Sequence, residues 1–206
     1  METMKSKICL VTGANAGIGK TTALGLAKMG AVVVMVSRNQ ERGEAARAEI
    51  MAESENDAVD LMIADLSSQQ SIRQLAEDYK THYERLDVLV NNAGGIFDPR
   101  SLTVDGLEYT FALNHLSYFL LTNLLLERIK ESSPARIVNV SSQAHADATI
   151  NFDDLQSEQD YSTRRVYGQS KLANILFTYE LARRLDGAGV MTNALHPGVV
   201  RTNFWP

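Results

Sequence analysis

The strongest constraint on this chain is a repeated alternation between short apolar runs and longer amphipathic stretches. Several runs are β-branched and apolar almost throughout, which is typical of parallel strands covered on both faces. The six candidate strands are Lys7–Thr12, Ala31–Val36, Val59–Ile63, Leu86–Val90, Arg136–Val140 and Met191–Leu195. The helical patterns between them are Gly17–Met29, Gln40–Glu53, Gln69–Tyr83, Gly106–Lys130 and Thr163–Leu185. This order predicts right-handed βαβ units and a doubly wound, three-layer α/β fold with a parallel sheet and helices on both faces.

Length and composition narrow the function classes. The 206 residues suit one domain over residues 1–206, and no linker or low-complexity segment divides them. A net charge of −5 argues against a nucleic-acid-binding face. No apolar run is long enough for a membrane anchor or a signal-peptide core, so we expect a cytoplasmic protein. One cysteine, Cys9, sits in an apolar run, and the four histidines lack ligand spacing, so no metal site is predicted.

A glycine-rich loop follows the first candidate strand and opens the first helix, reading Thr12-Gly-Ala-Asn-Ala-Gly-Ile-Gly19. Gly13 permits a tight turn, Gly17 lets the backbone approach a pyrophosphate, and Gly19 lets helix and strand pack closely. The helix N-terminus adds free N–H groups and a partial positive charge. The loop therefore predicts a phosphate site in a Rossmann-type domain, to which Asn15 and Ile18 belong.

The residue type at the end of the second strand favours one cofactor. An NAD-binding Rossmann domain usually carries a carboxylate there, which accepts from the ribose 2′-hydroxyl. This chain instead reads Ser37-Arg38-Asn39, and Glu41 is the first carboxylate after the strand. Arg38 can bind a 2′-phosphate with two parallel hydrogen bonds, whereas a carboxylate would repel it. We therefore predict NADP(H); the alternative is a solvated surface arginine. Lys20 is interpreted as a solvated helix residue.

The spacing TGxxxGxG differs from GxGxxG and resembles the short-chain dehydrogenase/reductase family, as does the segment Asn91-Asn-Ala-Gly94. The resemblance implies that Asn92, Ala93 and Gly94 contact the cofactor, and Asn91 is interpreted as structural. It also implies that Asp65, beside Leu66, contacts the adenine amine, the alternative being an N-cap. In the segment Pro197-Gly-Val-Val-Arg-Thr202, it implies that Pro197, Gly198, Val200 and Thr202 hold the nicotinamide end.

A YxxxK motif, Tyr167-Gly-Gln-Ser-Lys171, lies in the last helical pattern. Spacing i,i+4 puts both side chains on one face. Lowering the pKa of a tyrosine from about 10 to about 7 takes roughly 4 kcal/mol. An ammonium ~4–5 Å away supplies about that amount at an effective dielectric of about 20. We therefore expect Lys171 to lower the pKa of Tyr167. Alone, the pair could equally be an exposed surface pair.

Further residues complete the catalytic set that the resemblance implies. The strand Ile137-Val-Asn-Val-Ser-Ser142 ends in two serines, and Ser142 is preferred over Ser141 as the group that binds the substrate oxygen. Asn114 matches the asparagine that holds a water against the lysine. The proposed reaction transfers hydride between nicotinamide and a small-molecule carbonyl or alcohol, with Tyr167 as proton donor or acceptor. Tyr167 and Lys171 also belong to the cofactor site.

Two departures and two alternatives remain. Ser142 and Tyr167 are 25 residues apart, and the stretch between them includes Asn151-Phe-Asp-Asp-Leu155. This stretch resembles the retinol-dehydrogenase-like branch of the family, which implies an apolar substrate. The chain ends at Pro206, whereas the resemblance implies that a substrate-covering region and one more sheet strand follow this point.

A cofactor-binding regulatory module with little catalysis is therefore the main alternative to an oxidoreductase. A sugar-nucleotide epimerase is another, disfavoured by the loop spacing. The family also implies a homo-oligomer paired through its long helices.

Overall fold

The protein forms one parallel sheet, and its structure, a computed structural model, describes residues 3–198. The strands are β1 Ile8–Thr12, β2 Val32–Ser37, β3 Val59–Ile63, β4 Val88–Asn91, β5 Ala135–Val140 and β6 Val190–Leu195. Their order is β3-β2-β1-β4-β5-β6, and every pairing is parallel. The order reverses between β1 and β4, where Rossmann folds bind ligands beyond the carboxyl ends of the strands. The predicted fold class is confirmed, and within residues 3–198 no seventh strand follows β6.

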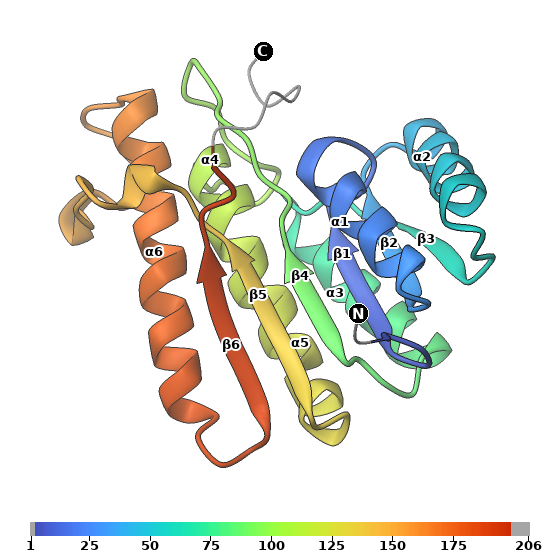
Figure 1. The fold of residues 1–206 in the computed structure, drawn as a ribbon. Helices are drawn as coiled ribbons and strands as arrows, with labels where there is room; N and C mark the ends of the chain where they lie inside the picture. Colours follow the sequence, from blue (N-terminus) through green and yellow to red (C-terminus); the bar gives the residue numbers. More distant parts are fainter. Residues whose placement is uncertain (1–2, 199–206) are drawn as a thin grey trace.

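Helices cover both faces of the sheet (Figure 1). The long ones are α1 Gly17–Lys28, α2 Gln40–Ser54, α3 Gln69–His82, α5 Ser117–Glu131 and α6 Thr163–Arg184. One core packs α3, α5 and α6 against the sheet through residues such as Leu75, Leu125 and Leu181. The other packs α1 and α2 around Val33 and the buried thiol of Cys9. No helix among residues 3–198 is both long enough and apolar enough to cross a membrane.

The helix predicted from Gly106 starts later and is not uniform. Gly106 has φ +75° and belongs to a turn, and α4 Tyr109–Phe111 begins after Glu108. The Glu108 carboxylate caps it by accepting from the N–H groups of Thr110 and Phe111, at 2.8 and 2.6 Å. A π-helical segment, η1 Ala112–Leu116, then joins α4 to α5. The predicted helix Gly106–Lys130 was wrong at its start and in its regularity. The helical spacing of apolar residues continues through the turn and the π segment, so the sequence pattern does not reveal either of them.

The polar stretch between β5 and α6 is ordered by hydrogen bonds, although its composition predicts a surface loop. It holds two 3₁₀ turns, η2 Gln143–His145 and η3 Phe152–Asp154. Gln156 accepts from the Glu108 N–H at 2.7 Å, and its carbonyl accepts from Arg100 at 3.1 Å. The Tyr161 hydroxyl donates to the Phe97 carbonyl at 2.6 Å. These bonds fix the stretch against the segment that follows β4.

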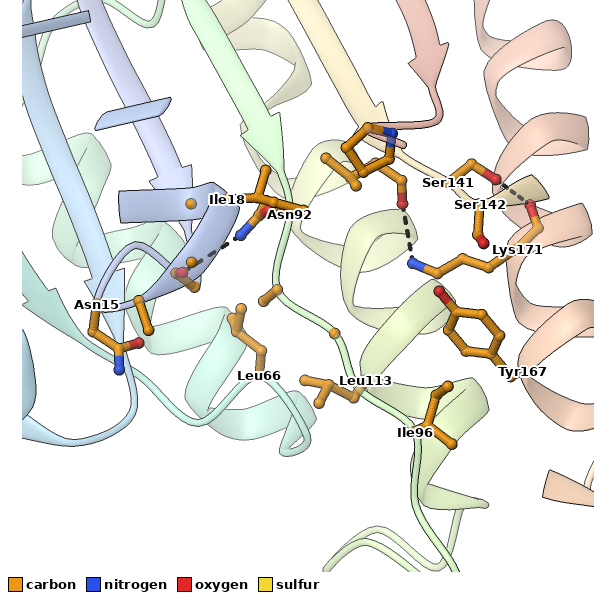
Figure 2. Close-up of a pocket in the computed structure, with 18 of the residues that line it drawn as sticks. Asn15, Ile18, Leu66, Asn92, Ile96, Leu113, Ser141, Ser142, Tyr167 and Lys171 are labelled. Carbon is orange, nitrogen blue, oxygen red and sulfur yellow. Dashed lines mark hydrogen bonds between the residues drawn. The ribbon is translucent and has the colours of Figure 1, made fainter. Parts of the chain in front are cut away.

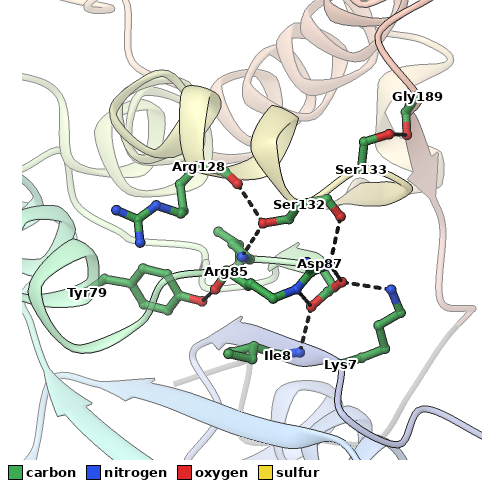
Figure 3. Close-up of polar contacts among 10 residues, drawn as sticks. Lys7, Ile8, Tyr79, Arg85, Asp87, Arg128, Ser132, Ser133 and Gly189 are labelled. Atoms are coloured by element: carbon green, nitrogen blue, oxygen red, sulfur yellow. Dashed lines mark hydrogen bonds and ion pairs between the residues drawn. The ribbon is translucent and has the colours of Figure 1, made fainter.

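The amino ends of the central strands meet in a cluster around Asp87, whose side chain is 1% exposed (Figure 3). Lys7 and Arg85 each donate to this carboxylate at 2.8 Å, and the Ile8 N–H donates at 3.0 Å. Burial favours the protonated acid, but these donors outweigh it and hold the Asp87 pKa below its usual range. The cluster ties β1, β4 and the end of α5, where Ser132 accepts from Arg85 and from the Leu86 N–H.

Candidate active site

The glycine loop has the backbone that its sequence predicts. Gly13 and Gly17 have φ of +66° and +53°, in the region that favours glycine. A Cβ on Gly19 would lie 2.3 Å from the Gly13 carbonyl oxygen and 2.5 Å from Nδ2 of Asn92, so only glycine fits. The N-cap of α1, Ala16, has no side chain to cap the helix. The first N–H groups of α1 are therefore left for a ligand.

Asn92 holds the loop against the end of β4. Its Nδ2 donates to the Thr12 carbonyl at 2.8 Å, and the Thr12 hydroxyl accepts from the N–H groups of Asn92 and Ala93 at 2.9 and 3.0 Å. Asn91 is fully buried and donates to Thr122 and Asn139 at 3.0 and 2.9 Å, which ties β4 to α5 and β5. The structural interpretation of Asn91 fits these bonds, and Asn92 combines a structural bond with a place in the site.

A cavity of about 700 Å³ runs along the carboxyl edge of the sheet (Figure 2). The glycine loop, with Asn15 and Ile18, lies at one end, and Ser142 with Tyr167 lies at the other. Most of the predicted site residues line it, namely Gly13, Asn15, Gly17, Ile18, Gly19, Ser37, Arg38, Asp65, Leu66, Asn92, Ala93, Gly94, Ser142, Tyr167, Lys171, Pro197 and Gly198. Asn39 and Asn114 do not line it. Val200 and Thr202 lie outside the described residues.

The residues after β2 and β3 divide into cavity-facing and capping groups. The Arg38 guanidinium lines the cavity and donates to the Tyr109 hydroxyl at 2.9 Å. Asn39 instead caps α2 by accepting from the Arg42 N–H at 2.8 Å. Asp65 lines the cavity and accepts from the N–H and hydroxyl of Ser67, so Asp65 is not the N-cap of α3. Ser68 has that role.

Two sets of hydrogen-bond and ion-pair contacts bear on residues whose roles the sequence left open. The Ser141 hydroxyl is buried and donates to the Lys171 carbonyl at 2.9 Å, so it joins the end of β5 to α6. The Ser142 hydroxyl lines the cavity and accepts from the Ala144 N–H at 3.3 Å. Both serines line the cavity, but the Ser141 hydroxyl already donates its proton within the protein, which favours Ser142 as the hydroxyl that could donate to a substrate oxygen. Lys20 forms an ion pair with Glu49 of α2, as expected of a helix residue away from the site.

Lys171 is buried beneath the site, 3% exposed, and burial lowers its pKa to about 7. Its Nζ donates to the Val140 carbonyl at 3.0 Å, as Figure 2 shows. Two tyrosine rings flank it, with centroids 5.6 Å away for Tyr167 and 5.8 Å for Tyr118. A low dielectric disfavours the ammonium, so this lysine exchanges its proton near neutral pH.

Burial raises the pKa of Tyr167 above its usual value, and a hydrogen bond with Ser142 opposes that shift. This net direction is opposite to the expected lowering, and the contribution of Lys171 to the Tyr167 pKa stays a prediction. Burial penalises the phenolate, and it also lowers the pKa of Lys171, which reduces the positive charge beside the phenol. At neutral pH the phenol is therefore protonated.

Asn114 lies in the π segment and is fully buried. Its side chain bonds both backbone groups of Gly95 at 2.9 Å and reaches Ser170 at 3.2 Å. Its carbonyl accepts from Nδ2 of Asn174 at 2.9 Å. A Cβ on Gly94 would lie 2.8 Å from Oδ1 of Asn114, so the asparagine supports the wall of the cavity from behind. A carbonyl oxygen has a second lone pair, which leaves room for one more donor.

The cavity has the features that a dinucleotide requires. Uncapped N–H groups and a glycine cradle suit a pyrophosphate, and Arg38 suits a phosphate on the adjoining ribose. Close packing at Gly13 and Gly19 leaves no room for a side chain at these two positions of the loop. The residues present therefore fit a nicotinamide dinucleotide whose reactive end lies beside Tyr167.

The family model described as short chain dehydrogenase matches residues 7–206, nearly the whole chain. The chain belongs to the short-chain dehydrogenase family. It is 50% identical to human retinol dehydrogenase 13, over 98% of this chain and 61% of that protein. It is 52% identical to mouse retinol dehydrogenase 12, over 94% of this chain and 61% of that protein. This short-chain dehydrogenase thus spans less than two thirds of the length of these curated relatives.

Solved structures agree with the family and the fold. An uncharacterised protein from Mycobacterium paratuberculosis is 41% identical with a TM-score of 0.84, over 98% of this chain and 72% of that one. A short-chain dehydrogenase from Sphingobium yanoikuyae, in complex with NADPH, is 27% identical with a TM-score of 0.79. That match covers 97% of this chain and 73% of the other.

Sequence reasoning missed several cavity residues of this short-chain dehydrogenase. Ile96 and Phe97 extend the wall after β4, and Arg164 extends it before Tyr167. A pattern could have found Arg164, because it precedes Tyr167 by three positions and so shares its helix face. Nothing in the sequence indicates that Tyr109 meets Arg38, since 71 residues separate them.

Proposed function

We propose that this protein is an NADP(H)-dependent oxidoreductase that interconverts a carbonyl compound and its alcohol. The observation that most strongly supports this proposal is that one cavity joins two groups of residues. Ser142, Tyr167 and Lys171 lie together at one end of it, and the glycine loop and Arg38 line the rest. The names of the similar retinol dehydrogenases support a carbonyl or alcohol substrate with an apolar body. The cavity-lining catalytic set disfavours a regulatory module without turnover.

The proposed cofactor contacts follow the cavity. The glycine loop and the N-terminus of α1 hold the pyrophosphate, and Arg38 binds the 2′-phosphate. Asp65 lies at the adenine end, and Pro197 and Gly198 lie at the nicotinamide end. When bound, the cofactor supplies or accepts the hydride. A neighbour solved with NADPH supports the choice of phosphate form.

The chain's own residues handle the proton. In the reduction, the carbonyl carbon gains the hydride, its C=O π bond breaks, and Tyr167 gives its proton to the oxygen. Ser142 donates a hydrogen bond to that oxygen as negative charge develops. The raised pKa of Tyr167 keeps the phenol protonated before the reduction, so that it can act as the proton donor. Lys171, with its pKa near neutrality, returns a proton to the phenolate with Asn114 and solvent.

Assembly and location are also proposals. Phe119 on α5 and Leu176 on α6 are 49% and 48% exposed, and they lie on the two long helices expected to pair in a homo-oligomer. Light scattering of the purified protein measures its mass directly. The cytoplasmic location stays a prediction, which fluorescence microscopy of a tagged full-length protein can test.

The test is NADPH oxidation with aromatic and aliphatic aldehydes and ketones. Tyr167→Phe should reduce kcat at least ~100-fold while the Kd for NADPH stays within about twofold, because only the proton donor is removed. Tyr179→Phe is the matched control, since this phenol lies on the same helix and is 70% exposed. Retained turnover in Tyr167→Phe would refute the proton-donor role, and tight NADPH binding without any turnover would favour the regulatory module.

A further inference from the structure

The helix that carries the catalytic pair presents a third side chain to the same cavity. Arg164, Tyr167 and Lys171 are spaced i, i+3 and i+7, and all three line the cavity. A rise of 1.5 Å per residue places the Cα of Arg164 about 4.5 Å beyond that of Tyr167, on the side away from Lys171. Arg164 is therefore placed to contact a substrate that reaches Tyr167 from that side.

The Arg164 side chain is exposed and contributes a cation to the lining of the cavity. Its neighbour Arg165 is paired with Asp160 at 2.9 Å, but no described carboxylate forms an ion pair with Arg164. Among the residues that line the cavity, Asp65 is the one carboxylate, and it lies at the adenine end beside Leu66. A charged group in such a position attracts an anion over short distances.

Apolar side chains, among them Ile96 and Ala144, also line the cavity. Ile96 lies next to the Tyr167 ring in Figure 2. We propose that Arg164 forms an anion subsite that selects carbonyl substrates with an apolar body and a carboxylate. This assignment rests on the proposed function and narrows its substrate class. The reaction is unchanged, because the carboxylate is bound and does not react.

The test compares two rigid probes that share one aromatic aldehyde and differ only in the para group, 4-carboxybenzaldehyde and 4-methylbenzaldehyde. The unmodified protein should reduce the carboxylate probe with a kcat/KM about tenfold higher or more, as expected of a charge-assisted hydrogen bond. Arg164→Gln should bring the ratio near one and leave the rate with the methyl probe within about twofold. Arg164→Lys should keep part of the preference.

Arg165→Gln is the matched control, because it removes an adjacent guanidinium that is paired with Asp160. An equal ratio in the unmodified protein, or a ratio that Arg164→Gln leaves unchanged, would overturn the anion subsite while the oxidoreductase remains. Failure of both probes, together with a broad panel of other carbonyls, would overturn the proposed function and this inference with it.

A separate observation concerns the opposite end of the cavity. The Tyr109 hydroxyl accepts from Nη1 of Arg38 at 2.9 Å. The Tyr109 ring packs edge-on against Phe97, with centroids 4.5 Å apart, and the Phe97 carbonyl accepts from Tyr161 at 2.6 Å. The guanidinium is thus held by a phenol that is itself fixed. Its other N–H groups remain for a phosphate.

We infer that Tyr109 is a positioning residue for phosphate recognition by Arg38. Tyr109→Phe keeps the ring on Phe97 and removes the hydroxyl, so it should raise the KM for NADPH about three- to tenfold. The KM for NADH and both kcat values should stay unchanged, which a general folding defect would not produce. Arg38→Gln should raise the KM for NADPH further. An unchanged KM in Tyr109→Phe beside a raised KM in Arg38→Gln would overturn this inference alone, and no effect in either would overturn the cofactor assignment.

Discussion

Replacing the buried lysine of the active site should make the folded protein more stable. Lys171 is 3% exposed and its pKa falls from 10.5 to about 7 on burial. The folded state therefore binds this proton less tightly than the unfolded chain does. Protonation favours unfolding, so the penalty is fully present below pH 7 and disappears as pH rises toward the ordinary lysine value. Lys171→Met fills the same space without the charge and should remove that penalty.

The size of the effect follows from the shift. A fall in the Lys171 pKa from 10.5 to about 7 corresponds to a penalty of about 5 kcal/mol at pH 6 and about 2 kcal/mol at pH 9. The bond from Nζ to the Val140 carbonyl is lost in the variant, which costs about 1 kcal/mol at either pH. The expected gain in the free energy of unfolding is therefore about 4 kcal/mol at pH 6 and about 1 kcal/mol at pH 9.

Urea unfolding followed by circular dichroism at pH 6, 7, 8 and 9 measures this directly. Lys130→Met is the control, because Lys130 lies on the surface of α5 and pairs with Glu127. Its effect should stay within about 0.5 kcal/mol at every pH. A gain that does not depend on pH, or a loss of stability at pH 6, would refute the reasoning. Lys171→Met should also lose turnover, so the site trades stability for proton transfer.

Three further perturbations test single contacts. Gly19→Ala should destabilise the fold by about 1–3 kcal/mol because its Cβ would strike a carbonyl, whereas Gly25→Ala, with open space around it, should stabilise by about 0.5–1 kcal/mol; thermal unfolding separates them. Ser142→Ala should lower kcat about 100-fold, while Ser141→Ala should cost about 1 kcal/mol of stability and leave kcat close to unchanged; the reverse pattern would exchange their roles. Asp87→Asn should cost about 2 kcal/mol at pH 7, and the difference from the unmodified protein should vanish as pH falls below the carboxylate's lowered pKa; a constant difference down to pH 3 would contradict the charge assignment.

The sheet could be predicted from the sequence because its strands are continuous apolar runs. The structure moves the strand boundaries by at most two residues: Val59–Ile63 is unchanged, and Val32–Ser37 replaces Ala31–Val36. The backbone of the glycine loop could also be predicted, because the space around Gly19 excludes every residue with a Cβ atom. Such features depend on local periodicity and backbone geometry, which short segments of sequence carry.

The roles of individual site residues could not be predicted in this way, because they depend on the direction and burial of each side chain in the folded protein. Asn39 follows Arg38 directly, yet one caps a helix and the other lines the cavity. The two serines at the end of β5 differ because successive strand residues point to opposite faces. The proton affinities of Tyr167 and Lys171 depend on how much water surrounds both groups, and the i,i+4 spacing gives no measure of that burial.

The π segment of the fourth helical stretch has a consequence for how this protein tolerates insertions and deletions. A π turn is an α-helix with one residue added. Each α-helical residue turns the chain by about 100°. Deleting one residue from Ala112–Leu116 would therefore turn Asn114 away from Gly95 or turn Tyr109 away from Arg38, but not correct both. The one extra residue of the π segment sets the rotation of Tyr109 relative to Asn114, and these two residues serve opposite ends of the cavity. A deletion or insertion in this segment should therefore impair the protein far more than a substitution on the helix surface.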